Sequence, residues 1–308
     1  MNQADTRRGF QLAQRIVDLL SRLEERWFPS DRVDWGHDSA ATCMVSSSGN
    51  IFLRAVPLAL TSLDDLIGIE DQSRLLLSNL RAFLDQKPCN HMLLSGARGT
   101  GKSSMVRAAL NSLSLQGLRL VELHREHIGY LTDVAHSLAL VSSHRFVILM
   151  DDLGFDNDDS DYRTLKAILD GSVGGLSDNV MICVTSNRRH LMPEYQWENQ
   201  QARIENGMLH LAEASEDKLA LADRFGLWLR FHPMNQVLYL EAVACWINHW
   251  RHEPLPDMQW EEVNREALRW ALARGGRSGR CAEQFARHWV GVLEPQKPGR
   301  IIPDDEPS

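Results

Sequence analysis

One nine-residue stretch constrains the fold of this chain more than any other feature. It reads Gly96-Ala97-Arg98-Gly99-Thr100-Gly101-Lys102-Ser103-Ser104 and matches the pattern G-x-x-x-x-G-K-[ST]. Glycines let successive backbone N–H groups point into one concavity, and a helix that begins there adds the positive end of its dipole. The stretch is therefore predicted to bind the phosphates of a nucleotide.

The residues on either side of this loop predict a strand–loop–helix unit. Residues 91–95 are typical of a short buried strand, and residues 105–110 continue as a helix. In such a unit Lys102 reaches the β- and γ-phosphates, and the Ser103 hydroxyl ligates Mg²⁺. The alternative, a glycine-rich turn that binds nothing, does not explain why a strand and a helix flank the loop.

The composition is that of an ordinary globular protein. The chain has 308 residues, of which 44% are hydrophobic and 24% are charged, and its formal net charge is −8. An acidic chain is not expected to coat nucleic acid, although a local basic patch stays open. The five cysteines lack CxxC spacing, which predicts reduced, mostly buried thiols and no metal site of their own.

The sequence predicts a cytoplasmic protein with no membrane partner. No segment approaches the roughly 20 apolar residues that cross a bilayer. Charged residues, Arg7, Arg8 and Arg15 among them, interrupt the apolar side chains near the N-terminus.

Downstream of the loop, apolar runs alternate with helical patterns. The expected strands cover residues 118–124, 146–150, 179–187 and about 226–232, and expected helices lie near 129–140 and 161–170. This alternation predicts parallel βαβ units. The fold class is therefore an α/β P-loop NTPase core, with three α/β/α layers and a parallel sheet.

The chain is expected to divide into four parts. They are an N-terminal helical extension (1–60), an α/β nucleotide-binding core (61–233), a small all-helical lid (234–293) and a flexible acidic tail (294–308). Within the extension we expect an irregular stretch over residues 29–49 and a strand within 50–60. In the lid, Ser278 is the expected cap of the last helix.

Two carboxylates follow the apolar run 146–150 and give it the Walker B form. Asp151 is predicted to hold the Mg²⁺ shell, and Asp152 to polarise the attacking water. A glutamate is commoner at the second position, and the aspartate reaches less far by one methylene. Weak turnover therefore stays open, as does assistance from the nearby Asp156 or Asp158.

Further site residues are expected at the edges of the predicted core. Asn187 ends a strand, where its amide can hold the nucleophilic water, and Arg224 precedes the last strand as an arginine finger for the adjacent subunit. An intramolecular salt bridge is the alternative role of Arg224. Other candidates are Ile67 and Gly68 for the adenine, with a simple helix entry as the alternative, and either Arg277 or Arg280 for the phosphates.

With these motifs assembled, the chain resembles the AAA+ ATPase superfamily over residues 63–293, and it is most similar to the bacterial domain-of-unknown-function family 815. The strings that carry the closer resemblance are the phosphate loop and residues 151–155, 185–191, 223–228 and 276–280. The resemblance implies an ATP-binding core with a helical lid that works as a homo-oligomeric ring, a hexamer being one candidate. The family supplies no substrate.

The leading functional hypothesis is an ATPase that uses ATP and Mg²⁺ at subunit interfaces to remodel an unidentified protein or nucleic-acid client. One alternative is an ATP-gated assembly or binding module with little hydrolysis. Another is a DNA-associated loader. Tyr130 is a candidate pore residue for a protein-threading machine, with the first turn of a helix as its other interpretation.

Overall fold

The computed structural model describes residues 33–46, 49–58, 61–153, 160–169, 176–187, 224–251 and 255–293. The chain divides into two compact units. The sheet unit comprises Met1–Leu63, Asp71–Ala97 and Lys102–Phe231, and the helical unit comprises Asp64–Glu70, Arg98–Gly101 and His232–Ser308, so far as these ranges are described. The predicted helix near residues 10–28 and the predicted tail at 294–308 lie outside the described residues.

The described part of the sheet unit contains a sheet of seven strands. These are β1 (Ala40–Val45), β2 (Ile51–Ala55), β3 (Met92–Gly96), β4 (Leu118–Glu122), β5 (Arg145–Met150), β6 (Val180–Ser186) and β7 (Leu227–Phe231). Their order is β2-β1-β4-β5-β6-β3-β7. Every neighbouring pair is parallel except the antiparallel hairpin of β1 and β2. The predicted parallel core is thus confirmed, with one antiparallel strand added at its edge.

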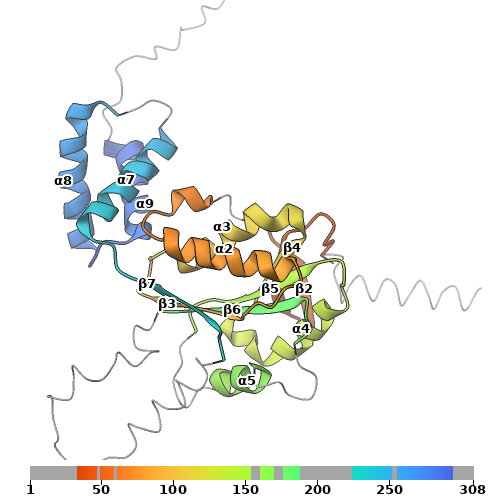
Figure 1. Ribbon diagram of the computed structural model, residues 1–308. Helices are drawn as coiled ribbons and strands as arrows, with labels where there is room; N and C mark the ends of the chain where they lie inside the picture. Colours follow the sequence, from red (N-terminus) through yellow and green to blue (C-terminus); the bar gives the residue numbers. More distant parts are fainter. Residues whose placement is uncertain are drawn as a thin grey trace, which may run out of the picture. The chain divides into compact units, whose positions relative to one another are not determined.

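Helices cover both faces of this sheet. The α-helices of the unit are α2 (Glu70–Leu84), α3 (Lys102–Leu113), α4 (Leu131–Ala139) and α5 (Ser160–Leu169), and its 3₁₀ turns are η2 (Ser114–Gln116) and η3 (Arg125–Tyr130). A further 3₁₀ turn, η1 (Leu63–Asp65), has its last two residues in the helical unit. Figure 1 shows α2 and α3 on one face of the sheet and α4 and α5 on the other. This confirms the three-layer α/β/α architecture. The central strands β5 and β6 are apolar runs buried between the two layers, as parallel strands require.

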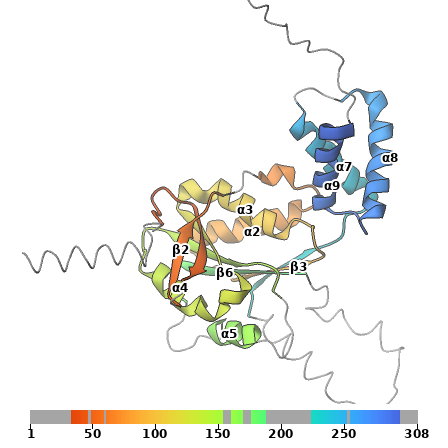
Figure 2. The same ribbon diagram turned by 180° about the vertical axis from the view of Figure 1, so that it is seen from behind.

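The prediction that residues 29–49 are irregular is wrong for β1. Ala40, Ala41 and Cys43 are buried, and β1 pairs with β4 in parallel. Alanine has little intrinsic preference for strands, and the serines and glycine at 46–49 signal a turn, so the pattern hid the strand. Pairing with β4 imposes the extended conformation. Both strands of the hairpin fall within the range predicted as an extension, yet they belong to the sheet (Figure 2).

The helical unit is a small bundle with its own core. Its helices are α7 (Gln236–Trp250), α8 (Asp257–Ala273) and α9 (Gly279–His288), followed by the π-helical turn η4 (Trp289–Leu293). Tyr239 is fully buried at its centre and donates a hydrogen bond to the Ala267 carbonyl at 3.0 Å. The Ser278 hydroxyl accepts from the Cys281 N–H at 3.2 Å, which confirms the predicted cap.

Two further expectations concern membranes and thiols. Among the residues that the structure describes, no helix combines the length and the apolar character needed to cross a bilayer. All five cysteines are free thiols, and Cys43, Cys183 and Cys281 are buried, as predicted. Burial raises the pKa of the Cys43 thiol to about 11, so this thiol stays protonated at neutral pH.

We predict that Arg119→Met lowers the free energy of unfolding by roughly 2–4 kcal/mol, because buried charge-assisted hydrogen bonds are lost. The Arg119 guanidinium is buried and donates to the carbonyl oxygens of Trp35 (2.8 and 2.9 Å) and Ser114 (2.7 Å), so it holds the segment before β1 against β4. Hydrogen exchange should show faster exchange in β1. Arg81→Met on the exposed surface of α2 is the control, and equal exchange in β1 of both variants would contradict the prediction.

Candidate functional site

The candidate site lies at the carboxyl edge of the sheet, where β3, β6 and β5 end side by side. Parallel strands end at the same edge, and ligands of such sheets bind where the strand order reverses. Here β6 separates β3 from β5, although it follows both in the chain. Ser95 lies opposite Ser186, and Met150 lies opposite Val184. The next residues along these strands are Gly96 of the phosphate loop, Asn187 and the two carboxylates.

Lys102 begins α3, and three acceptors hold its ammonium group. Nζ donates to the Gly96 carbonyl at 2.9 Å, to the Ala97 carbonyl at 2.8 Å and to Asn187 Oδ1 at 2.8 Å. The residue is only 6% exposed, so these bonds replace the water that a lysine normally keeps. The ammonium is thereby fixed at the mouth of the loop, with the amide of Asn187 beside it.

Asp151 is surrounded by hydroxyl and guanidinium groups. Its Oδ1 accepts hydrogen bonds from the hydroxyls of Ser103 and Thr185. Arg107 NH2 lies 3.9 Å from Asp151 Oδ2, and Arg107 Nε lies 2.7 Å from Glu122 Oε1. Since Arg107 follows Ser103 by one helical turn, α3 presents both to the same carboxylate. Helix α3 and strand β6 therefore orient Asp151 from two sides.

Asp152 adopts a backbone conformation that is uncommon for a residue other than glycine. Its φ is +57°, in the left-handed region, and its N–H donates to Thr185 Oγ1 at 2.9 Å. Its Oδ1 accepts a hydrogen bond from Asn187 Nδ2. Because Asn187 Oδ1 accepts from Lys102, one amide connects the phosphate-loop lysine to the second carboxylate.

The oxygen donors of this site fit a magnesium ion. Mg²⁺ prefers hard oxygen ligands and usually keeps several of its waters, so it needs only one or two protein ligands. Ser103 and Asp151 place a hydroxyl and a carboxylate in contact, and the Asp151 side chain is 44% exposed. No cluster of three or more histidine, cysteine or acidic side chains suited to a metal is found in the described residues. The donor set thus suits a metal that arrives with a phosphate.

Gly96 is required by close backbone packing at the end of β3. Its φ is +148°, and a Cβ on Gly96 would lie 2.2 Å from the carbonyl oxygen of Phe231, on the adjacent strand β7. Any side chain at this position would therefore displace β7 or the phosphate loop.

Within the helical unit, loop residues 98–101 pack against the start of α9. The Arg280 N–H donates to the Gly99 carbonyl at 3.4 Å, and a Cβ on Gly99 would lie 2.9 Å from Ser278 Oγ. Gly68 has a φ of +78° and packs on Leu238, and its N–H donates to Glu70. The structure thus brings the Arg280 backbone to the loop, while no such contact is found for Arg277 within the described residues.

Two other predicted residues are placed by the elements that they adjoin. Arg224 precedes β7, whose first residue, Leu227, lies opposite Met92, so Arg224 is at the amino edge of the sheet. The sheet therefore does not bring Arg224 to Asp152 within one chain. Tyr130 ends η3 and leads directly into α4, which fits its interpretation as a helix start. The candidates Asp156 and Asp158 lie outside the described residues.

Thr185, Arg107 and Glu122 belong to this network and were not predicted as site residues. A signal for Thr185 was present, because side chains two apart on a strand share a face and Thr185 precedes Asn187 by two. The helical spacing of four between Ser103 and Arg107 was the corresponding signal on α3. Glu122 ends β4, and the sequence offered no signal for its partner.

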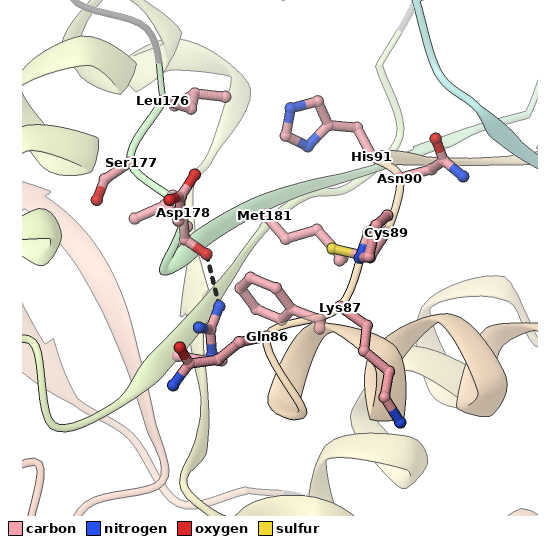
Figure 3. A pocket seen from close by; sticks show the side chains of 13 residues that line it. Gln86, Lys87, Cys89, Asn90, His91, Leu176, Ser177, Asp178 and Met181 are labelled. Atoms are coloured by element: carbon pink, nitrogen blue, oxygen red, sulfur yellow. Dashed lines mark hydrogen bonds between the residues drawn. The ribbon is translucent and has the colours of Figure 1, made fainter.

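A separate pocket of about 480 Å³ opens at the amino edge, opposite the candidate site. Its walls come from the end of α2, the segment before β3 and the starts of β5 and β6, as Figure 3 shows. Arg145 NH1 donates to the Asp178 carbonyl at 2.6 Å, and the guanidinium lies 5.0 Å from the ring centre of Phe83. None of the predicted site residues lines this pocket.

The chain matches a known sequence family and several solved structures. Residues 39–293 match the sequence family described as "Protein of unknown function (DUF815)", and the chain belongs to it. A search of curated proteins found no match. Among solved structures, a point mutant of Thermotoga maritima RuvB is similar at a TM-score of 0.50 and 18% identity, over 75% of this chain and 66% of that chain.

Two more solved structures are similar. The Aeropyrum pernix ORC1 protein, solved in complex with DNA, has a TM-score of 0.50 and 15% identity, over 78% of this chain and 62% of that chain. C. elegans PCH-2 has a TM-score of 0.48 and 17% identity, over 77% and 65%. All three are AAA+ proteins, and this chain spans less than two thirds of the length of each. At these identities the likeness to the RuvB and ORC1 structures shows the fold alone, which is of the AAA+ type.

We predict that Gly96→Ala lowers the free energy of unfolding by about 3 kcal/mol or more, since the added methyl group meets a backbone oxygen that cannot move aside. Denaturant unfolding followed by circular dichroism measures this change. Gly129→Ala is the matched control, because a Cβ there meets nothing within 4 Å. Similar midpoints for the two variants would show that the β3–β7 packing is looser than described.

Proposed function

Because the chain belongs to the DUF815 family and has the AAA+ fold, we propose that it binds ATP with Mg²⁺ and hydrolyses it. The observation that carries the proposal is the linked network at the carboxyl edge. Lys102, Asn187 and Asp152 form one continuous chain of hydrogen bonds, and Ser103 and Asp151 form another contact beside it. A glycine-rich turn with no ligand does not require a buried ammonium group, an amide and two carboxylates to be linked by hydrogen bonds at one edge of a sheet.

In this proposal Lys102 exchanges its present partners, the carbonyl oxygens of Gly96 and Ala97 and Oδ1 of Asn187, for phosphate oxygens. The ammonium has three donors, and two of them bond neutral carbonyl oxygens of the loop. Anionic phosphate oxygens are stronger acceptors for a cation than carbonyl groups are. Bound Mg²⁺ would neutralise charge on the phosphates, and Ser103 and Asp151 would hold it.

Asp152 is the proposed acceptor of the proton from the attacking water. Its carboxylate is held by Asn187 Nδ2, so the amide sets the direction of the acid. General-base catalysis requires such a group within hydrogen-bond reach of the water. Asn187 is the proposed second contact of that water.

Arg224 is proposed to act on the site of an adjacent subunit. It lies at the edge of the sheet opposite to Asp152, so a cation at this position serves a neighbouring copy more readily than its own site. A guanidinium that enters from a neighbour stabilises the charge that develops on the transferred phosphoryl group. Activity would then require a homo-oligomer, for which a closed ring is the expected arrangement.

A nucleotide-gated binding module is the second candidate. Asp152 supports it, because its side chain is one methylene shorter than the commoner glutamate. Such a protein would assemble with ATP and turn it over slowly. The client, whether protein or nucleic acid, is to be identified from what co-purifies with a variant that binds ATP without hydrolysing it.

We predict that Asp152→Asn retains ATP binding and lowers kcat at least about 100-fold, because the amide cannot accept the proton. Lys102→Ala should lose ATP binding, because the cation that faces the phosphates is removed. Fluorescent-nucleotide titration and phosphate release measure the two effects. Asp133→Asn, an exposed carboxylate on α4, is the control. Unchanged turnover in Asp152→Asn would reject its role as the base.

If the site is completed by a neighbouring subunit, the specific turnover of the wild type should rise with protein concentration. Arg224→Ala should abolish this turnover. The sharper experiment mixes Arg224→Ala with Asp152→Asn, since each variant retains what the other lacks. Activity should reappear in the mixture, because about one quarter of the interfaces in a randomly mixed ring join an intact site to an intact arginine. A mixture as inactive as its components would show that Arg224 does not act in trans.

A further inference from the structure

We propose that Thr185 is a positioning residue for the hydrolysis site. Its single hydroxyl holds Asp151 by the carboxylate and Asp152 by the backbone, so it sets the directions of both acids. This inference rests on the proposed function, because it assigns Thr185 a part in the Mg²⁺-dependent reaction. It concerns a residue one strand away from the acids that it orients.

The pairing of β5 with β6 places Thr185 beside the acids. Val184 lies opposite Met150, the last residue of β5, so Thr185 is adjacent to Asp151, the first residue after the strand. Thr185 is 1% exposed, and its χ1 is restricted because the residue is β-branched. A buried hydroxyl on a rigid side chain can therefore keep two partners in fixed directions.

The hydrogen bonds of Thr185 are complementary in polarity. A hydroxyl has one proton to donate and lone pairs to accept. Thr185 Oγ1 gives its proton to Asp151 Oδ1, and it accepts the N–H of Asp152 at 2.9 Å. Both bonds form at once, and neither a valine nor an alanine could make either of them.

The bond to the Asp152 N–H supports an unfavourable backbone conformation. The left-handed region is uncommon for a residue other than glycine, and Asp152 has a φ of +57°. The Leu153 N–H donates to the Thr185 carbonyl at 2.9 Å, so side chain and main chain of Thr185 hold two successive amides of this turn. Held in this conformation, the turn directs the Asp152 carboxylate to Asn187.

The bond to Asp151 acquires its importance when a metal binds. Ser103 and Thr185 now donate to the same oxygen of Asp151. Mg²⁺ would use a lone pair of the Ser103 oxygen, whereas Thr185 is not a proposed metal ligand and would hold the carboxylate independently of the metal. Groups that orient a ligand without touching the metal typically contribute roughly 10- to 100-fold to affinity or activity.

The test is Thr185→Val, which keeps the shape of the side chain and removes its hydroxyl. Affinity for a fluorescent ATP analogue is measured in EDTA and in Mg²⁺, and phosphate release is measured over a range of Mg²⁺ concentrations. We expect affinity in EDTA to stay within about 3-fold of wild type. Two quantities should each fall roughly 10-fold: kcat, and the factor by which Mg²⁺ increases the affinity. Half-maximal turnover should need more Mg²⁺.

Two further variants separate positioning from stability. Thr185→Ser restores the hydroxyl and should recover most of the Mg²⁺ response. Thr42→Val removes a hydroxyl from β1 that lies 3.5 Å from the Glu122 carbonyl and contacts neither acid, so it should respond to Mg²⁺ as wild type does. Two results for Thr185→Val would overturn the inference. In one, nucleotide affinity falls equally in EDTA and in Mg²⁺; in the other, both the affinity in Mg²⁺ and kcat stay at the wild-type values.

The same measurements distinguish this inference from the proposed function. If the wild-type chain binds ATP more tightly with Mg²⁺ and releases no phosphate, hydrolysis is wrong, and the Mg²⁺ gain in Thr185→Val still decides the role of Thr185. If the wild-type chain binds no nucleotide in either condition, both proposals are wrong.

Discussion

The insertion of β6 between β3 and β5 is the pairing on which the candidate site depends. Hydrogen bonds on both edges of β6 fix its register with β3 and β5, and therefore the positions along the strands at which the phosphate loop and the two acids begin. A slip of one residue would turn the side chains of β6 to the opposite faces, and Thr185 and Asn187 would leave the acids. The site is thus a consequence of strand register, and its polar groups need no loop of their own to bring them together.

The two neighbouring acids have different surroundings, which suits different tasks. Asp151 receives two hydroxyl donors and lies near the Arg107 guanidinium, so its charge is compensated from several directions. Asp152 lies beyond it in a left-handed turn, with the amide of Asn187 as its side-chain contact. A compensated carboxylate is a suitable metal ligand, and a carboxylate oriented by a neutral amide suits the role proposed for Asp152 as the base.

Much of this arrangement could be predicted from sequence, and the rest could not, for identifiable reasons. The phosphate loop, the apolar strands and the acids at their ends are local patterns, so the parallel core and the cluster around Lys102 followed from them. Strand β1 escaped because Ala40 and Ala41 have no strand preference of their own and become extended only by pairing with β4. The double contact of Thr185 depends on the register between β5 and β6, and its partner Asp151 is 34 residues away in sequence, so no local pattern encodes it.

The three bonds of Lys102 have a consequence for how a ligand is received. In the proposed function, an incoming phosphate would compete with Gly96, Ala97 and Asn187 for the ammonium of Lys102. That competition works as a threshold, because a weak anion gains too little to displace three partners, whereas a polyphosphate offers several acceptors at once. When the lysine leaves, Asn187 loses one of its two contacts and keeps the other on Asp152. The side-chain amide of Asn187 would thereby couple ligand binding at Lys102 to the orientation of the Asp152 carboxylate.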